Sequence, residues 1–168
     1  MGLFDKLFRK EPTFQIEAEP KTLYLPIAGE VIPLREIGDG VFSDEVLGKG
    51  FGIRPCEQTA YAPVSGSVTS IADTKHAIGL LSDDGIEVLI HVGMDTVEMN
   101  GESFSVLVKE GQKVACGQPI LKFDVKKIEA AGHPTTTAVV VTNSDDYSDV
   151  SLLSIGSKEK LISILKVK

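Results

Sequence analysis

The chain has 168 residues and a mass of 18.0 kDa, enough for one domain with a hydrophobic core and too short for two of ordinary size. Hydrophobic residues make up 42% of it and charged residues 24%, a composition that excludes a disordered protein. The formal net charge of −7 argues against a nucleic-acid-binding protein, which needs excess positive charge, and it fits a partner with a basic face.

The first twenty residues differ from the rest of the chain. Basic residues separate apolar side chains that recur there at helical spacing. These apolar residues are Leu3, Phe4, Leu7 and Phe8. The pattern predicts either a short amphipathic helix that makes weak contact with a membrane surface or a partner, or a frayed flexible tail. Residues 11–20 have the composition of a linker, so we expect the main domain to begin at Lys21.

The sequence also indicates the compartment. No run of about 18 apolar residues occurs, and a membrane-spanning helix requires one. The N-terminus lacks the long apolar core of a secretory signal. Cys56 and Cys116 are far apart and have no CxxC spacing, so we expect two reduced thiols in a cytoplasmic protein.

From residue 22 onward, short runs rich in β-branched and aromatic residues alternate with turn residues. They predict strands at 23–25, 30–33, 51–53, 59–61, 67–71, 77–81, 86–91, 119–123, 138–142 and 161–167. One short helix is expected at 125–131, before Gly132, because a glycine commonly follows the last turn of a helix. About ten strands at this spacing predict an all-β sandwich or barrel with short helical segments.

A glycine-rich stretch at residues 110–120 has the spacing of a hairpin in lipoyl and biotinyl carrier domains. Those domains attach their cofactor to a lysine, typically within the tripeptide Met-Lys-Met, which this chain lacks. We therefore interpret the stretch as a scaffold hairpin rather than a carrier arm, and we expect no attached cofactor.

The turn sequence Ser-Asp-Asp-Gly at residues 82–85 lies between two of the predicted strands. If this turn closes a hairpin, Leu81 faces Ile86 and His76 faces His91. Directly opposed residues of an antiparallel pair have Cβ atoms about 5 Å apart, on the same face of the sheet. The turn therefore predicts two imidazoles side by side at the open end of the hairpin.

Two adjacent imidazoles have three interpretations. One ring attacks an electrophilic phosphorus while the other donates a hydrogen bond to the phosphoryl oxygens. Alternatively, both bind a metal, or the pair has no chemical role. A metal is disfavoured because no third protein ligand is evident: Asp95 and Glu98 are near only in sequence, and His133 is far away and is expected to be structural or exposed.

The residues around both histidines form a pattern that covers nearly the whole chain. The two central segments are 74–78, Thr-Lys-His-Ala-Ile, and 88–97, Val-Leu-Ile-His-Val-Gly-Met-Asp-Thr-Val. Other parts of the pattern are Phe42, residues 48–55, 62–66 and 101–104, and the glycines at 111 and 117. Together they resemble the glucose-type enzyme IIA family of the bacterial phosphoenolpyruvate:sugar phosphotransferase system.

The resemblance implies a β-sandwich of the duplicated hybrid-motif type, with a shallow active-site depression in one EIIA domain at residues 21–168. It implies that His91 is the phosphorylated nucleophile, that His76 hydrogen-bonds the phosphoryl group, and that Thr74 orients His76. The phosphoryl group would pass from the phosphohistidine of HPr to His91, and then to a cysteine on a sugar-specific IIB domain. Positioning and charge stabilisation would carry the transfer through a loose transition state without a general base, and we expect no metal and no cofactor.

The resemblance also implies a docking surface and a monomer. Apolar Phe42 and Val92 would form a dry centre, and Asp39 and Asp95 an acidic rim that faces a basic partner. The net charge of −7 agrees with this rim, since such charges mainly raise encounter rates.

Two departures from the family pattern bear on the choice of partner. Residues 92–94 are Val-Gly-Met where members commonly have Phe-Gly-Ile, and Cys56 follows Arg54-Pro55, where no thiol is usual. The alternative function is a non-catalytic regulatory module whose partners depend on its phosphorylation state, because phosphorylation adds nearly two negative charges to the docking face.

Overall fold

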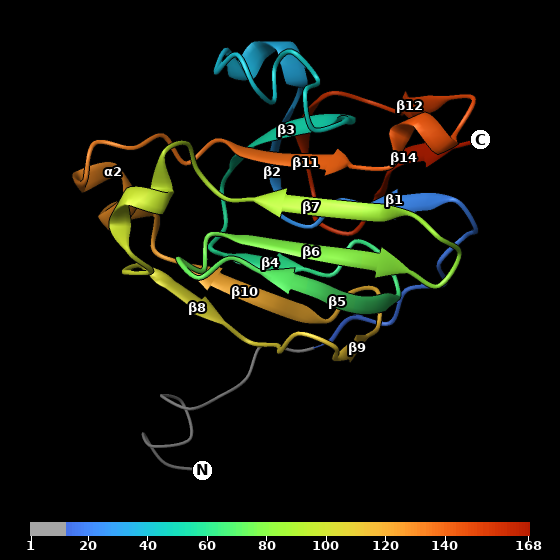
Figure 1. Cartoon of the computed structure of the whole chain (residues 1–168), viewed down its shortest axis with the longest axis horizontal. Coiled ribbons are helices and arrows are strands. Elements are labelled where there is room, and N and C mark those ends of the chain that lie inside the picture. The colour runs from blue at the N-terminus through green and yellow to red at the C-terminus, as the bar shows by residue number, and fades with distance from the viewer. Residues whose placement is uncertain (1–12) are drawn as a thin grey trace.

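The computed structural model describes residues 13–168, and this part of the chain is almost entirely β-structure (Figure 1). The strands are β1 (Thr22–Tyr24), β2 (Gly29–Pro33), β3 (Lys49–Pro55), β4 (Thr59–Tyr61), β5 (Gly66–Ile71), β6 (Ala77–Ser82), β7 (Glu87–His91), β8 (Phe104–Val106), β9 (Lys113–Val114), β10 (Pro119–Phe123), β11 (Thr137–Val141), β12 (Val150–Leu152), β13 (Gly156–Lys158) and β14 (Ser163–Val167). The short helices are η1 (Leu34–Ile37), η2 (Thr96–Met99), α2 (Val125–Ala130) and η3 (Ser144–Asp146).

The strands form one large sheet and two small ones. The large sheet has the order β13-β2-β3-β11-β7-β6-β5-β9, and the small sheets have the orders β1-β14-β12 and β4-β10-β8. One core cluster joins all three, with Phe51 and Ile90 from the large sheet, Leu165 from β14 and Ile120 from β10. Because the core lies between open sheets, the all-β prediction is confirmed as a sandwich, and no sheet closes into a barrel.

Alternation along β7 decides which face of the large sheet carries each side chain. Val88 and Ile90 point into the core, at 2% and 1% exposure. Glu87, Leu89 and His91 occupy the opposite, outer face and keep some contact with solvent. The last residue of β7, His91, therefore projects from the outer face of the sandwich.

Each of the ten predicted strand ranges overlaps an observed strand, and the predicted helix is α2. Four short strands, β8, β9, β12 and β13, were not predicted, since two or three residues do not establish an alternation. The glycine-rich stretch at 110–120 does not form the predicted hairpin. Its strands β9 and β10 join different sheets, because β9 pairs with β5 and β10 with β4 and β8.

The β6–β7 connection differs by one residue from the predicted pairing. The Ser82 amide donates to the Ile86 carbonyl (2.9 Å), and the Gly85 amide donates to the Ser82 carbonyl (3.0 Å). The loop thus has three residues and ends at Gly85, whose φ of 96° is left-handed. As a result Leu81 faces Glu87 rather than Ile86.

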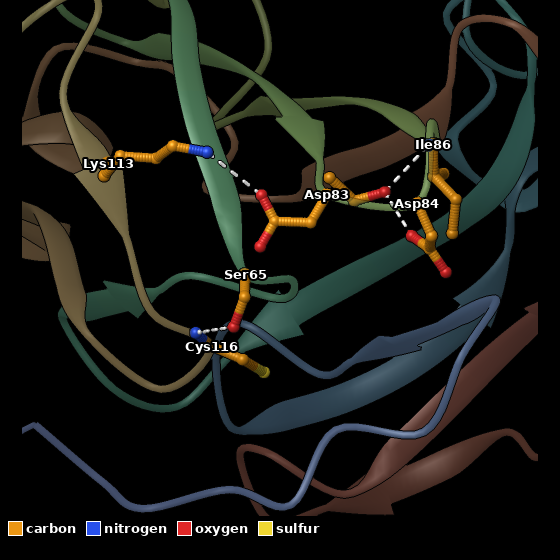
Figure 2. Close-up of polar contacts among 7 residues, drawn as sticks. Ser65, Asp83, Asp84, Ile86, Lys113 and Cys116 are labelled. Atoms are coloured by element: carbon orange, nitrogen blue, oxygen red, sulfur yellow. Dashed lines mark hydrogen bonds and ion pairs between the residues drawn. The ribbon is translucent and has the colours of Figure 1, made fainter.

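Polar contacts hold this three-residue loop in place (Figure 2). The Ser82 hydroxyl donates to the Asp84 carboxylate and accepts the Ile86 amide, which closes the loop from within. Asp83 accepts from the ammonium of Lys113 at 3.1 Å and so ties the loop to β9. These contacts fix the register of β6 against β7.

Several contacts join the segment before β1 to the sandwich. The Phe14 amide donates to the Gly117 carbonyl (3.1 Å), and the Phe14 ring meets the ring of Tyr61 edge-on at 5.3 Å. Further along, the Glu19 amide donates to the Tyr24 hydroxyl. The predicted amphipathic run at Leu3–Phe8 lies outside the described residues. Within residues 13–168, no helix is long and apolar enough to cross a membrane.

We expect Gly85→Ala to lower the free energy of unfolding by about 1 kcal/mol, because a Cβ disfavours positive φ. No atom lies within 4 Å of the position that this Cβ would occupy, so the effect is one of backbone conformation alone. Gly85→Asn should cost less, since Asn adopts left-handed φ more readily. Urea denaturation of both variants tests this, and equal costs for Ala and Asn would contradict it.

Candidate functional site

The site lies where β6 begins and β7 ends, on the outer face of the large sheet. His91 is the last residue of β7 and pairs with Ala77 of β6 and Ala138 of β11. Both neighbours are alanines, so small side chains flank the imidazole of His91 on the surface of the sheet. This arrangement leaves room for the ring and for groups that approach it.

His76 also lies at this site, but its position in the strand pairing differs from the predicted one. It precedes β6, and its carbonyl accepts the Val92 amide (2.8 Å), so it lies opposite Val92 and not opposite His91. The predicted cross-strand pairing is wrong because the loop at Gly85 has one residue more than a two-residue turn. Lys75, with a left-handed φ of 64°, reverses the chain immediately before His76 and turns this residue out of the strand alternation.

The two imidazoles nevertheless meet. Their ring centroids are 4.6 Å apart and their planes lie at 80°, so that one ring presents its edge to the face of the other. The prediction that these histidines lie side by side is confirmed, although the backbone route is not the predicted one.

Thr74 fixes the orientation of His76. The hydroxyl oxygen of Thr74 lies 2.8 Å from Nδ1 of His76, and the two share a hydrogen bond. When the hydroxyl donates, Nδ1 is the acceptor and the proton of the neutral ring resides on Nε2. The ring then has an N–H donor on its other side.

An aromatic side chain flanks each histidine. The Phe42 ring lies 4.9 Å from the His91 ring at 55°, and the Phe104 ring lies 6.4 Å from the His76 ring at 61°. Phe42 belongs to a small outer-face cluster, which consists of Leu34, Phe42, Ala138 and Val140 with Ile37, Leu89 and Met94 packed against it. Apolar contacts therefore surround the imidazole pair on both sides.

Asp39 organises the loop that carries Phe42. Its two carboxylate oxygens accept the amides of Phe42 (3.1 Å) and Ser43 (3.0 Å). Burial acts to raise the pKa of Asp39, but the hydrogen bonds from the amides of Ser43 and Phe42 outweigh it and hold the pKa below its ordinary value. Asp39 is thus an ionised cap for this loop as well as an exposed acid near His91.

Burial lowers the pKa of both histidines. The pKa of His91 falls to about 4, chiefly because its ring is desolvated and secondly because His76 lies beside it. The backbone of Gly93 and the charge of Asp39 oppose this shift without cancelling it. Desolvation also lowers the pKa of His76, against a smaller opposing contribution from a hydrogen bond with the backbone of Thr74. Both rings are therefore neutral at pH 7.

The two nitrogens of His91 are not equivalent. Nδ1 is buried and makes no hydrogen bond of ordinary geometry among the described residues, although the backbone of Gly93 lies close enough to favour the protonated ring. The side chain as a whole keeps partial exposure. Because Nδ1 is enclosed, Nε2 is the nitrogen left for an incoming group.

The predicted docking residues do not all lie on the surface. Val92 is fully buried in the main core, because it follows the outward-facing His91 and so points to the inner face of the sheet. Its amide donates to the His76 carbonyl, and its carbonyl accepts the Thr96 hydroxyl at 2.6 Å. Its predicted contact with a partner is therefore wrong. Phe42 is only 6% exposed, so it packs on His91 rather than forming an open surface. Asp39 and Asp95 are exposed, as a rim requires.

Exposed apolar residues lie instead on the loop around Phe42. Val41, Val46 and Leu47 are 43%, 66% and 41% exposed. The sequence carries a signal for them, since an apolar and acidic run is bounded by Gly40 and Gly48, both of which have left-handed φ.

The remaining candidates lie apart from the histidine pair. Within residues 13–168, no group of three His, Cys, Asp or Glu side chains is placed to hold a metal. His133 follows α2, where its amide donates to the Ile128 carbonyl, and its ring lies 3.8 Å from Glu98. Cys56 and Cys116 are both free thiols, and burial raises the pKa of Cys116 to about 11.

Comparison with known proteins gives a consistent result. Residues 21–147 match the family model described as phosphoenolpyruvate-dependent sugar phosphotransferase system, EIIA 1. The chain is 49% identical to the PTS system beta-glucoside-specific EIIBCA component of Bacillus subtilis (strain 168), over 88% of this chain and 25% of that protein. It is 37% identical to the PTS system glucose-specific EIIA component of Staphylococcus aureus (strain COL), over 89% of each.

The fold comparison agrees. The structure superposes on glucose permease IIA from Mycoplasma capricolum with a TM-score of 0.82 and 28% identity, and covers 90% of this chain and 98% of that one. The chain spans about a quarter of the length of the beta-glucoside-specific relatives that it matches, with 25% and 22% of the two proteins covered.

We expect His91 to stay neutral until the pH falls to about 4, and His76 to protonate below the ordinary histidine value. Because the folded-state pKa of His91 is lowered, the unfolded chain binds the proton more readily. The free energy of unfolding should therefore decrease as pH falls from about 6.5 to about 4.

NMR titration of the imidazole resonances and urea denaturation between these pH values measure both effects. His91→Gln should remove part of the pH dependence of stability. A His91 pKa near its ordinary value would contradict the structure's account of a desolvated ring.

Proposed function

The chain belongs to the EIIA 1 family of the phosphoenolpyruvate-dependent sugar phosphotransferase system, and we propose that His91 is the residue on which it carries the phosphoryl group. The observation that carries this proposal is the imidazole pair, whose ring centroids are 4.6 Å apart. One ring is sealed at Nδ1, and the other is oriented by Thr74. These features supply one nucleophile and one hydrogen-bond donor at the same point.

In this proposal Nε2 of His91 attacks the phosphorus of a donor phosphohistidine. The lone pair of Nε2 forms the new P–N bond while the donor's P–N bond breaks, and the electron pair of that bond returns to the donor ring. The lowered pKa of His91 supports this step, because only a neutral ring offers the lone pair. The reverse sequence hands the phosphoryl group onward, since an imidazole is both a good nucleophile and a good leaving group.

His76 donates from Nε2–H to a phosphoryl oxygen. The Thr74 hydroxyl supports this tautomer by donating to Nδ1, and burial supports the neutral state of the ring. A donor fixed before the reaction stabilises the charge of the transferring group without reorganisation at the moment of transfer.

The donor we propose is HPr, and the acceptor is a cysteine on a sugar-specific IIB domain. The exposed acids Asp39 and Asp95 and the exposed apolar residues Val41, Val46 and Leu47 support docking of a partner with apolar and basic groups. The relatives' names point to a carrier for a β-glucoside or for glucose. We place the domain at residues 21–168, acting as a cytoplasmic monomer.

Incubation with phosphoenolpyruvate, enzyme I and HPr should add one acid-labile phosphoryl group to the wild-type chain, as measured by intact mass. His91→Ala should take none. His76→Ala should still accept the group but pass it to a IIB domain roughly 10²–10³-fold more slowly, because one transition-state donor is lost.

A phosphoryl group retained in His91→Ala would identify a different nucleophile. If the folded wild-type chain takes no phosphoryl group from donors shown to be active, the relay fails and the regulatory module becomes the better account.

Thr74→Val should slow transfer about tenfold, since loss of one hydrogen bond of about 1.4 kcal/mol frees the orientation and tautomer of His76. Thr74→Ser keeps the hydroxyl and should retain most of the rate. Rapid-quench measurement of transfer compares the two variants, and an equal loss in both would show that the hydroxyl alone does not account for the effect of Thr74.

A further inference from the structure

One segment of chain connects the two histidines. It leaves β7 directly after His91, passes through η2 and ends at Phe104, whose ring contacts His76. At its beginning the hydroxyl of Thr96, a fully buried residue, donates to the Val92 carbonyl. The segment 92–104 is thus anchored beside His91 at one end and against His76 at the other.

The far end of this segment also packs on the turn that holds His76. Gly101, with a left-handed φ of 83°, lies so close that a Cβ there would be 3.5 Å from Cδ of Lys75 and 3.7 Å from the carbonyl oxygen of Thr74. The Phe104 amide donates to the Gly101 carbonyl (3.3 Å). Backbone and ring therefore approach the Thr74–His76 turn together.

Phe104 is itself held rigidly. It is 7% exposed, belongs to the main core and lies in β8, where it pairs with Phe123 of β10. Packing in the core restricts the motion of this side chain. Its ring therefore forms one wall against His76.

We propose that Phe104 is a positioning residue for His76 in phosphoryl transfer, an inference that rests on the proposed function of the histidine pair. The hydrogen bond from Thr74 holds one nitrogen of His76 but leaves the ring free to pivot about that contact. The Phe104 ring contacts the His76 ring at 6.4 Å and so restricts this pivoting. The N–H of His76 therefore stays directed toward the group on His91.

Phe123 provides a matched control. It is also a buried phenylalanine of the main core, at 4% exposure, and it faces Phe104 across the β8–β10 pair. Among the described residues, His76 has ring contacts with His91 and Phe104, and none with Phe123. Phe123→Leu should thus remove similar packing without touching the histidine.

The test uses Phe104→Leu, Phe104→Met and Phe123→Leu in the full chain, with Phe104→Tyr as the conservative variant. Tyr keeps the ring, and a cavity of about 470 Å³ lined by Ser103, Phe104 and Phe123 leaves space beside it for the added hydroxyl. Folding of each variant is checked by urea denaturation, and Phe104→Met, whose unbranched side chain adapts to irregular space, serves if Phe104→Leu proves too unstable.

We expect Phe104→Leu and Phe104→Met to lower the rate constant for transfer to a IIB domain about tenfold, since misplacement of a transition-state donor is costly. The KM for IIB should change less than about twofold, because the ring is not part of the docking surface. In NMR titration the pKa of His76 should rise toward its ordinary value. Phe123→Leu should change both readouts far less than Phe104→Leu, and Phe104→Tyr should restore both.

Equal losses in Phe104→Leu and Phe123→Leu, or an unchanged His76 titration and rate in both ring-less Phe104 variants, would overturn the proposal. The outcome is distinguishable from a failure of the relay, since that failure appears as an unphosphorylated wild-type chain. The titration of His76 in the Phe104 variants still tests the positioning in that case.

Discussion

The register of β6 against β7 is the constraint on which the rest of the site depends. Because side chains alternate along a strand, a slip of one residue would turn His91 from the outer face into the core and bring Ile90 outward. The three-residue loop that ends at Gly85 prevents this slip, and Asp83, tied to Lys113, anchors the loop to β9. The turn at one end of the hairpin thus determines the face of the sheet on which His91 lies at the other end.

Desolvation is the second determinant, and it acts on both rings. Phe42 and Phe104 stand on opposite sides of the imidazole pair, and each belongs to a different apolar cluster. Their contacts keep the rings neutral and restrict their motion, while Asp39 holds the Phe42 loop in place without becoming protonated. Packing and electrostatics therefore serve the same end, which is a pair of oriented, uncharged imidazoles.

Much of this architecture could be predicted from the sequence, and the failures have physical reasons. Alternation and turn residues identified the strands of the core, but β12 and β13 are too short to show a period. The hairpin register was missed because Gly85 accommodates a third loop residue. Val92 lies in the core because it follows His91 in the strand alternation and so points to the inner face. The approach of Phe104 to His76 joins distant segments through η2, and no local pattern encodes it.

The enclosed Nδ1 of His91 has a consequence for the order in which partner proteins bind. Because Nδ1 is enclosed by protein, only one side of the His91 ring is accessible, and a partner protein must approach from the outer face of the sheet. A protein that delivers a group and a protein that collects it cannot be present together, so each must leave before the other arrives. The two partner proteins then compete for one binding site, and an excess of either slows transfer of the group between them.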